Sequence, residues 1–383
     1  MIKRKKVVKI LKYIKQGQTI GIIGGGQLGQ MLALDAKENG MKVLVLDPNP
    51  TCSAGQVADA QIVAAYDDFA ALQQLAKQAD VVTYEFENVD LAALEKLEKT
   101  IWLPQGTELL KITKNRLTEK TFLKEQGLDV VDFCEVNDEQ ELKQAVKKIG
   151  YPCILKTCEG GYDGKSQVNI NDSADLNEAG KLLRQGKCIL EGWLDFSLEC
   201  SVMVARNLAG EITVFPVSEN IHRNHILHLS IVPARIAENL QQVAKQAAVK
   251  IAKSLDLCGV LGVEMFVGKD GRVYINELAP RPHNSGHYSI EACDFSQFAI
   301  HNRAICGWPL PQITLLKPVV MVNVLGQHVC AIKKLIQTKP SWHFHDYGKD
   351  QALLDRKMGH VTILTDDLDK TLVEIEETKV WSD

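Results

Sequence analysis

The chain has 383 residues, 45% of them apolar and 24% charged, with 44 basic and 48 acidic side chains and a formal net charge of −4. This length predicts two or three domains, because a single hydrophobic core rarely grows so large. The balance of charge gives no basic face for nucleic acid, and no apolar run approaches the roughly 20 residues that span a bilayer. We therefore expect a cytoplasmic protein with neither nucleic-acid nor membrane partners.

Residues 1–18 form a basic extension with seven Lys or Arg and no acid. Its apolar residues Val7, Ile10, Leu11 and Ile14 would share one stripe of a helix. A basic amphipathic helix can lie on an anionic membrane, but such chain ends are more often frayed, docked on the protein or in contact with a second copy. We favour the latter group and expect the folded body to begin at residue 19.

The ten cysteines are scattered along the chain without a C-x-x-C pair. Many of them stand inside apolar runs such as PCILK and KCILEGW. This distribution predicts reduced, buried thiols rather than disulfides or a zinc site.

Residues 19–113 alternate short apolar runs with helical periods. The strands expected are TIGIIG (19–24), KVLVLD (42–47), QIVAA (61–65) and VVTYEF (81–86), with IWLPQG (101–106) closing the series, and the helices expected are QMLALDAKEN (30–39) and FAALQQLAKQ (69–78). Such alternation predicts a Rossmann-like domain, a parallel sheet with crossover helices whose strand order cannot be read.

The first strand runs into a glycine-rich turn. Gly24, Gly26 and Gly29 have the G-x-G-x-x-G spacing that lets a helix N-terminus approach phosphate. Asp47 stands 18 residues after Gly29, where a ribose-binding carboxylate is expected. An oxidoreductase that binds NAD is one interpretation. The alternative is a doubly wound domain whose turn approaches another ligand, because a lone glycine fingerprint is not specific.

The order of expected strands and helices changes after an amphipathic helix expected over 111–130, which has a glycine stop at Gly127. Strands now pair as hairpins, 153–157 with 167–171, 199–206 with 212–217 and 263–268 with 273–278, interrupted by one long helix at 238–255. This pattern predicts an α+β domain over 114–311. In residues 312–383, strands expected at 317–326 and 360–365 and a helix near 330–337 predict a small mixed β domain.

A second glycine-rich segment, TCEGGYDGKSQ (157–167), lies between two expected strands. It is not a P-loop, because the G-x-x-x-x-G-K-S spacing needs glycine where Glu159 stands and because a P-loop joins a strand to a helix. A glycine-rich hairpin loop can cover a triphosphate with backbone N–H groups, or it can be an ordinary flexible hairpin. Lys156, at the end of the strand before the loop, favours the phosphate interpretation.

An acidic pair follows in GVEMFVGKDGRVYINEL. A hairpin turn centred on Asp270-Gly271 places Glu264 and Glu277 directly opposite each other on neighbouring strands. Two carboxylates this close repel each other unless a cation lies between them or one takes a proton. With Asn276 beside them they predict a Mg²⁺ site shared with a nucleotide, although a solvated pair on an exposed face is the alternative.

These features together resemble the ATP-grasp superfamily: Lys156 before a glycine-rich hairpin loop, CILEGWL followed by Glu199, and the acidic pair with Asn276. Within the superfamily, IGIIGGGQLGQM, VVTYEFENV, GGYDGKSQ, NELAPRPHNSGHYSIEAC and HDYGK with DRKMGH are similar to segments of the phosphoribosylaminoimidazole carboxylase ATPase subunits, or carboxyaminoimidazole ribonucleotide synthetases. The resemblance covers the chain from about residue 19 to its end.

The resemblance implies an ATP-grasp fold in which a Rossmann-like domain (19–113) precedes the ATP-grasp domain (114–311) and the small C-terminal mixed β domain (312–383). It implies a carbon–nitrogen ligase of de novo purine biosynthesis. In that family ATP and bicarbonate give carboxyphosphate, which carboxylates the amine of 5-aminoimidazole ribonucleotide. ATP as co-substrate, Mg²⁺ as cofactor and a homodimer are therefore expected.

The resemblance also implies a role for each matching residue. The ATP site would comprise Arg116, Lys156, Gly161, Tyr162, Asp163, Gly164, Lys165, Ser166, Gln167, Glu191, Gly192, Trp193, Leu194, Glu199, His222, Asn276 and Glu277. The ribonucleotide site would comprise Gln27, Leu28, Glu85, Asp163, Asn284, Lys349 and Arg356, the last two binding the 5′-phosphate. Glu264 and Glu277 would bind Mg²⁺, and Asp163, Lys165 and Arg281 would act in catalysis.

Two places depart from the family pattern. Ser166 stands where the family loop usually has glycine, and Cys158 and Glu159 stand where a basic or bulkier entry is usual. A formate-using glycinamide ribonucleotide transformylase shares the fold, but it has a different glycine loop and an acid where Gln27 stands. An NAD oxidoreductase would leave Lys156 and the acidic pair unexplained. A non-catalytic relative is disfavoured because the expected metal and phosphate ligands are all retained.

Overall fold

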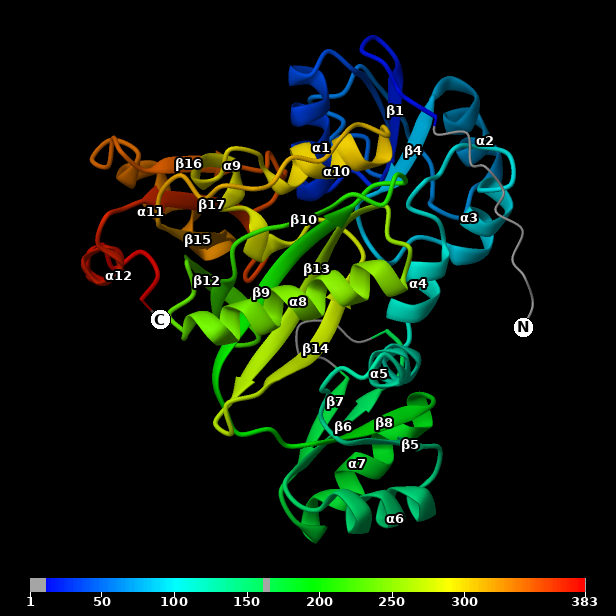
Figure 1. Cartoon of the computed structure of the whole chain (residues 1–383), viewed down its shortest axis with the longest axis vertical. Helices are drawn as coiled ribbons and strands as arrows, with labels where there is room; N and C mark the ends of the chain where they lie inside the picture. The colour runs from blue at the N-terminus through cyan, green and yellow to red at the C-terminus, as the bar shows by residue number, and fades with distance from the viewer. Residues whose placement is uncertain (1–11, 161–165, 383) are drawn as a thin grey trace.

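The computed structural model describes residues 12–160 and 166–382. Within these residues the chain forms two four-stranded sheets and one nine-stranded sheet. Figure 1 shows the N-terminal sheet at the top, the nine-stranded sheet across the middle and the other four-stranded sheet in a lobe at the bottom. The expectations for residues 1–11 and 161–165 lie outside the described residues.

The N-terminal sheet is parallel, as the alternation of strands and helices predicts. Its strands are β1 (Thr19–Ile23), β2 (Lys42–Leu46), β3 (Ala60–Ile62) and β4 (Val81–Tyr84), in the order β3-β2-β1-β4. Helices α1 (Gln27–Glu38) and α2 (Phe69–Gln78) connect the strands, and α3 (Leu91–Leu97) follows β4. The carboxyl ends of β1, β2 and β4 meet at one edge, the usual place for a ligand in an open parallel sheet.

Residues 101–106, expected as a strand, form none. The N–H of Val82 donates to the carbonyl of Trp102 at 2.9 Å, so the segment does lie beside β4. Pro104 has no N–H to donate, and Gly106 turns the backbone at φ +68°. These two residues prevent a regular ladder from forming.

The helix expected over 111–130 is two helices, α4 (Glu108–Thr113) and α5 (Arg116–Glu125). Asn115 breaks it, because its side chain accepts from the N–H groups of Leu117 and Thr118, both at 3.1 Å, and so begins a new helix. The glycine stop is confirmed: α5 ends before Gly127, whose φ is +64°. The break places Arg116 in the first turn of α5.

The lower lobe holds an antiparallel sheet. Its strands are β5 (Phe133–Val136), β6 (Cys153–Thr157), β7 (Gln167–Ile170) and β8 (Cys188–Gly192), in the order β5-β8-β6-β7. Helices α6 (Glu139–Ile149) and α7 (Leu176–Leu182) pack on it, with short turns η1 (Ser173–Asp175) and η2 (Leu183–Gln185) on either side of α7. The predicted hairpin of β6 and β7 is confirmed.

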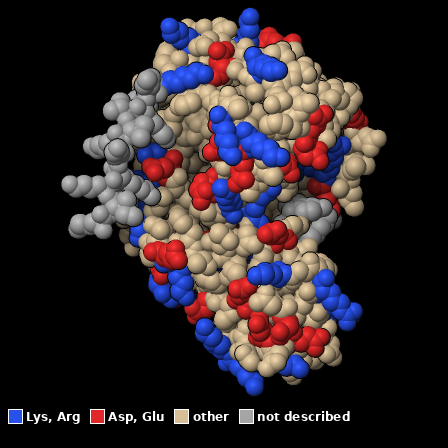
Figure 2. Space-filling model, turned by 90° about the vertical axis from the view of Figure 1, so that its right-hand side faces the viewer, with Lys and Arg blue, Asp and Glu red and all other residues tan. Residues whose placement is uncertain are grey.

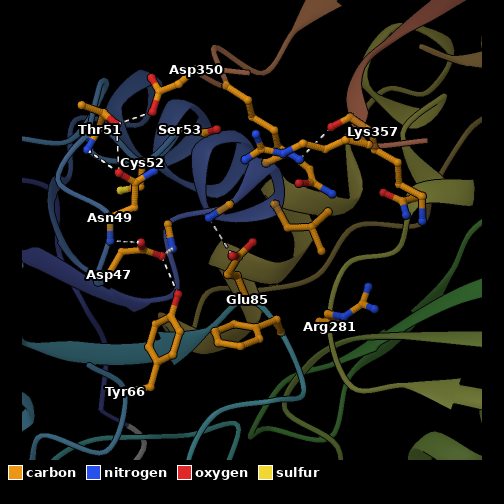
Figure 3. A pocket seen from close by; sticks show the side chains of 18 of the residues that line it. Asp47, Asn49, Thr51, Cys52, Ser53, Tyr66, Glu85, Arg281, Asp350 and Lys357 are labelled. Atoms are coloured by element: carbon orange, nitrogen blue, oxygen red, sulfur yellow. Dashed lines mark hydrogen bonds between the residues drawn. The ribbon is translucent and has the colours of Figure 1, made fainter. Parts of the chain in front are cut away.

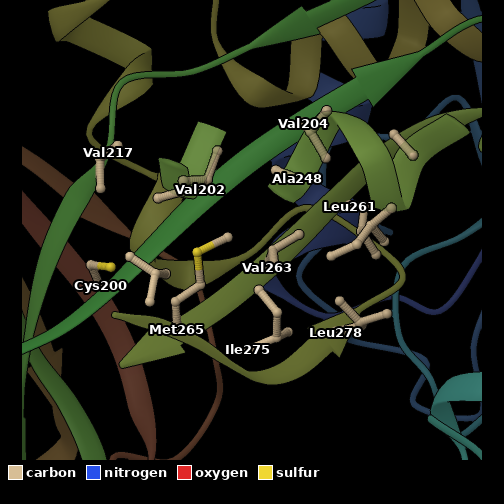
Figure 4. Close-up of a cluster of buried hydrophobic side chains, with 14 of the residues drawn as sticks. Cys200, Val202, Val204, Val217, Ala248, Leu261, Val263, Met265, Ile275 and Leu278 are labelled. Carbon is tan, nitrogen blue, oxygen red and sulfur yellow. The ribbon is translucent and has the colours of Figure 1, made fainter. Parts of the chain in front are cut away.

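The central sheet is built from the other predicted hairpins. Its first strands are β9 (Phe196–Arg206), β10 (Ile212–Val214), β11 (Ser218–Arg223), β12 (Ile226–Val232), β13 (Gly259–Gly268) and β14 (Val273–Ala279). Helix α8 (Glu238–Ser254) packs against them. Figure 4 shows the core between these elements. It contains Val202, Val263 and Ile275 of the neighbouring strands β9, β13 and β14, together with Ala248 of α8.

The C-terminal strands join this sheet. The strands β15 (Val319–Leu325), β16 (His343–Asp346) and β17 (Lys357–Leu364) follow η3 (Asn284–Gly286), α9 (Ser289–Ala292) and α10 (Gln297–Ile305). Turn η4 (Gly326–His328) and helices α11 (Val329–Leu335) and α12 (Leu368–Glu377) complete the chain. Because β15 pairs with β12 and every pairing here is antiparallel, these strands extend the nine-stranded sheet rather than form the small mixed sheet expected.

The described part of the N-terminal extension, residues 12–18, is docked and contains no helix. Ile14 is fully buried, its N–H donates to the carbonyl of Cys306 at 2.9 Å, and its carbonyl accepts from Trp308 Nε1 at 2.7 Å. The helical stripe expected to include Ile14 is therefore wrong there, because tertiary hydrogen bonds hold the backbone. Among the described residues, no helix combines the length and apolar character needed to cross a membrane.

Candidate active site

A cavity of about 430 Å³ opens at the carboxyl edge of the N-terminal sheet. It brings together seven residues predicted for the ribonucleotide site or for catalysis: Gln27, Leu28, Glu85, Arg281, Asn284, Lys349 and Arg356. They come from the first turn of α1, the position just after β4, the segment after β14 and the loop between β16 and β17. Asp163, predicted for the same site, lies outside the described residues. Four separate segments of the chain thus converge on one pocket.

The glycine turn is occupied by a carboxylate from the protein itself. Glu85 accepts from the N–H groups of Gly26 and Gly29 at 2.7 and 2.8 Å, and a Cβ at Gly26 would lie only 2.7 Å from its Oε1. Burial raises the pKa of Glu85, and the two N–H groups counter this. Figure 3 shows Glu85 pointing into the pocket toward α1. The N–H groups that a pyrophosphate would use therefore already have a partner.

Asp47 also forms hydrogen bonds within the protein. Its carboxylate accepts from the N–H of Gly25 at 2.7 Å and from the hydroxyl of Tyr66 at 2.5 Å (Figure 3), and it is buried. A ribose would have to displace these contacts. The NAD interpretation is wrong for this turn, because both carboxylates hold the protein's own backbone.

The acidic pair lies where it is predicted. Glu264 of β13 stands directly opposite Glu277 of β14. Repulsion from Glu264 raises the pKa of Glu277, while His283 donates Nε2 to Glu264 Oε1 at 2.8 Å and holds its pKa below the ordinary value in spite of burial. Two carboxylates that repel each other, with Glu277 exposed, fit a divalent cation whose remaining ligands come from phosphate oxygens.

The turn assumed for this pairing is wrong. The N–H of Gly268 donates to the carbonyl of Arg272 at 2.9 Å, so the loop has three residues and Gly271 adopts φ +79°. This loop alone would shift the pairing by one residue. A β-bulge at Asn276 restores it, since one extra residue on β14 moves the following residues back into the predicted register.

Lys156, which is predicted to hold phosphate, is one of two lysines that lie beside the same buried acid, Glu191. Lys156 Nζ lies 2.7 Å from Glu191 Oε2, and Lys120 Nζ of α5 lies 3.8 Å from Glu191 Oε1. Burial opposes ionisation, but Lys120 and Lys156 hold the pKa of Glu191 at about 2. No local pattern pointed to Lys120, because its partner Glu191 lies on a strand far away along the chain. An acid fixed between two lysines keeps their side chains in place before a nucleotide arrives.

Arg281 pairs with Glu87, which sequence reasoning did not single out as a partner. Its guanidinium contacts both carboxylate oxygens of Glu87, with Nη2 at 3.1 Å from Oε1. Burial opposes ionisation, but Arg281 holds the pKa of Glu87 at about 2. Arg281 also interacts electrostatically with Glu85 of the pocket and with Glu277 of the acidic pair. It lines the pocket and follows shortly after β14, the strand that carries Glu277. On the face seen in Figure 2, acidic and basic side chains gather near the junction of the lower lobe with the rest of the molecule.

Three family models match successive parts of the chain. They describe a ribonucleotide synthetase preATP-grasp domain (residues 17–114), an ATP-grasp domain (121–298) and a phosphoribosylaminoimidazole carboxylase C-terminal domain (319–374). The N5-carboxyaminoimidazole ribonucleotide synthase of Bacillus subtilis (strain 168) is 49% identical over 368 residues, or 96% of each chain. The chain belongs to the N5-carboxyaminoimidazole ribonucleotide synthase family. The ATP-grasp fold predicted from the sequence is confirmed.

Solved structures of this synthase family have the same fold. The Staphylococcus aureus N5-carboxyaminoimidazole synthetase complexed with ADP matches with a TM-score of 0.92 and 46% identity, over 96% of this chain and 98% of that one. The Aspergillus clavatus N5-carboxyaminoimidazole synthase in complex with ADP and 5-aminoimidazole ribonucleotide matches with a TM-score of 0.89 and 30% identity, over 95% and 98%.

The remaining predicted nucleotide residues that the structure describes lie on α5, on the lower lobe and on the central sheet. Glu199 of β9 and His222 of β11 pair at 2.7 Å, and although burial lowers it, Glu199 raises the pKa of His222 above its ordinary value. The segment that the family resemblance implies as an adenine hinge, Glu191 to Leu194, runs from the last residues of β8 into the loop that follows, where Trp193 is half exposed. Gln167 begins β7, and the Arg116 side chain donates to the carbonyl of Thr157 at 2.9 Å.

Both departures from the synthase family pattern have a structural consequence. Glu159 accepts from the Asn115 side chain at 3.0 Å, so its charge is partly tied to the cap of α5. Ser166 adopts φ +62°, in the left-handed region that favours glycine. A serine there is strained where glycine would not be.

Ser166→Gly is expected to stabilise the protein by about 0.5–1 kcal/mol, because the left-handed conformation carries no Cβ penalty in glycine. Urea unfolding measures this. Ser173→Gly is the matched control: Ser173 lies in the right-handed turn η1, so glycine should destabilise it slightly. A Ser166→Gly variant that is no more stable than Ser173→Gly would contradict the strain.

Proposed function

We propose that this chain carboxylates 5-aminoimidazole ribonucleotide with ATP and bicarbonate, forming carboxyaminoimidazole ribonucleotide, ADP and phosphate in de novo purine biosynthesis. The observation that carries this proposal is the pocket lined by Glu85, Asn284, Lys349 and Arg356. Arg281, which also lines it, follows β14, the strand that carries Glu277 of the acidic pair. The Aspergillus clavatus relative is described in complex with ADP and 5-aminoimidazole ribonucleotide. These two kinds of ligand correspond to the two sites that we propose for this chain.

The first step joins bicarbonate to the γ-phosphoryl group. An oxygen of bicarbonate attacks γ-phosphorus, the bond to ADP breaks and carboxyphosphate forms. Lys156, Arg116 and Mg²⁺ held by Glu264 and Glu277 would neutralise the charge that develops on the phosphoryl oxygens. The reaction needs positioned charge and no covalent protein intermediate.

The second step transfers the carboxyl group. The amine nitrogen of the ribonucleotide attacks the carboxyl carbon, directly or as released CO₂, while phosphate leaves and the amine loses a proton. Arg281, with its guanidinium fixed by Glu87, would hold the anion between the sites. Asp163 and Lys165, whose positions are not described, remain our candidates for the proton acceptor and for a phosphate contact on the glycine-rich segment.

The ribonucleotide would lie with its 5′-phosphate against Lys349 and Arg356. Both line the pocket, and Lys349 is joined there by Lys357. Gln27 and Leu28 would contact the same ligand from the first turn of α1. Because Lys349, Arg356 and Lys357 follow one another on one loop and the start of β17, they would give the phosphate, and with it the whole ligand, a single orientation in the cavity.

We also propose a cytoplasmic homodimer with the domain limits expected from the sequence, 19–113, 114–311 and 312–383. A reducing compartment is supported by the ten cysteines, none of which is in a disulfide. The dimer rests on the family resemblance.

ADP release tests the function. It should require bicarbonate together with 5-aminoimidazole ribonucleotide, and formate with glycinamide ribonucleotide should not replace them. Release that depends on formate would instead favour the transformylase, and NADH binding serves as the control for the oxidoreductase.

Ribonucleotide binding is expected to take up a proton above pH 8. Burial first and then Arg356 lower the pKa of Lys349 to about 8, so the free enzyme loses this charge as pH rises through 8, whereas a bound phosphate dianion raises the pKa again. Calorimetry at pH 8.5 in two buffers of different ionisation enthalpy measures the uptake. At pH 6.5, where Lys349 is already protonated, this uptake should vanish.

Lys349→Met should abolish the uptake at pH 8.5 and weaken ribonucleotide binding while leaving ATP binding within about twofold. An uptake that persists in this variant would show that another group titrates, and an equal loss for both ligands would contradict the division of substrates between the two sites.

A further inference from the structure

Lys349 stands on a loop whose backbone is fixed by the N-terminal domain. Gln56 donates to the carbonyl of Gly348 at 2.7 Å, and Thr51 donates to Asp350 Oδ2 at 2.6 Å. The ammonium of Lys349 donates to the carbonyl of Lys357 at 2.7 Å. These bonds hold the two ends of a flexible side chain. They leave open what supports the four-carbon stem between them.

Tyr347 supplies a wall for that side chain. Its ring is buried, and Lys349 Nζ lies 5.6 Å from the ring centroid. The N–H of Tyr347 donates to the carbonyl of Met358 at 2.9 Å, which continues the pairing of β16 with β17. An ammonium at this distance from an aromatic face is attracted to it. The position of the ring therefore bears directly on where the ammonium lies.

The far end of the tyrosine is held by a histidine. The Tyr347 hydroxyl and His360 Nδ1 lie 2.9 Å apart, and both residues are buried. Within the described part of the chain, the other ring nitrogen of His360 has no hydrogen-bond partner. The bond to Tyr347 is thus the polar contact that this imidazole makes there, and losing it would leave a buried polar ring unsatisfied.

His360 is in turn locked by other rings. It stacks on His345 of β16 at 4.2 Å with an interplanar angle of 9°, and His287 lies 4.8 Å away on the side of η3. His345 Nε2 lies 2.6 Å from Glu291 Oε1 of α9. Burial, followed by the neighbouring His287 and His345, keeps the pKa of His360 well below its ordinary value. A neutral ring here adds no positive charge that would repel Lys349.

We propose that Tyr347 and His360 are positioning residues that hold the ammonium of Lys349 toward the phosphate of the ribonucleotide. The inference rests on the role proposed above for Lys349. Neither side chain touches substrate in this arrangement: neither is among the residues that line the cavity. They act through Lys349, because the Tyr347 ring can shift once its hydroxyl has no partner, and a support of this kind decides how closely a binding group is held.

The test is the affinity for 5-aminoimidazole ribonucleotide, measured by calorimetry. Tyr347→Phe keeps the ring and removes its hydroxyl, and it should weaken binding by about tenfold, of the order of one lost hydrogen bond, while ATP binding stays within about twofold. His360→Phe keeps a ring against His345 and should give the same loss. The double variant should lose no more than either single variant, because both remove the same bond.

Lys349→Met decides between the inference and the role on which it rests. In that background Tyr347→Phe should cause no further loss, since the tyrosine acts through the lysine. If Lys349→Met leaves ribonucleotide affinity unchanged, the proposed role of Lys349 fails. If it weakens binding but Tyr347→Phe does not, or if the two losses add fully, the positioning role is overturned and the role of Lys349 stands.

Tyr288→Phe is the matched control. Tyr288 is equally buried and its hydroxyl donates to the carbonyl of Pro216 at 2.9 Å, away from Lys349. Its removal should lower the melting temperature by a similar amount without changing ribonucleotide affinity. A loss of affinity in this variant equal to that of Tyr347→Phe would mean that general destabilisation explains both, which would also overturn the inference.

Discussion

Glu277→Gln is expected to lower kcat for ADP release by at least about 10³-fold, while the fold stays intact. The amide keeps the shape of the side chain but removes the charge that would bind Mg²⁺ opposite Glu264, and charge stabilisation of this kind commonly contributes this much to phosphoryl transfer. The repulsion that raises the pKa of Glu277 also disappears, so the melting temperature should be equal to or higher than that of the native protein. A stopped or coupled assay at saturating ATP measures the rate, and thermal unfolding measures the fold.

Glu238→Gln provides the control for this substitution. Glu238 lies in the first turn of α8 and is exposed, so its exchange should change neither rate nor affinity. Native turnover in Glu277→Gln at millimolar Mg²⁺ would show that the acidic pair binds no essential metal.

Arg281→Lys is expected to lower kcat/KM for bicarbonate by about 10²–10³-fold. Lysine keeps the positive charge but cannot make the bidentate contact with Glu87. The charged group of residue 281 would therefore no longer be held in one position in the pocket. The effect should fall on bicarbonate rather than on ATP or the ribonucleotide. Initial rates with each substrate varied in turn measure this division.

Arg235→Lys is the matched control, because Arg235 makes the same kind of contact with Glu219, with Nε and Nη2 at 3.0 and 2.6 Å from the two oxygens. This pair does not line the cavity. Its exchange should cost stability and leave kcat/KM within about twofold. Equal losses of activity in the two variants would mean that Arg281 matters only for stability.

Much of the local structure followed from the sequence, because turns and short-range pairing depend on neighbouring residues. The hairpin that places Glu264 opposite Glu277 was predicted correctly even though its turn was not, since the bulge at Asn276 compensated for the longer loop. The break at Asn115 could have been predicted, because asparagine is a common N-cap residue. Residues 101–106 were expected as a strand because they begin with the apolar run Ile101 to Leu103, although Pro104 follows it.

The residues of the ribonucleotide pocket were predicted through resemblance. Resemblance named Glu85 and Arg281 without saying what holds them. The ion pair of Arg281 with Glu87 joins residues 194 positions apart, and no local pattern predicts such a contact. The same is true of Lys120, which shares Glu191 with the predicted Lys156.

The order of residues was enough to predict the parallel N-terminal sheet, the hairpins and the glycine turn before α1, since these depend on periodicity and on residues within a few positions of one another. The tertiary structure alone decided that Glu85 binds the N–H groups of that turn, that β15 pairs with β12, and that Tyr347 meets His360 behind Lys349. Each of these contacts joins distant segments, and their pairing is fixed by how whole elements pack rather than by any property of the residues taken in order.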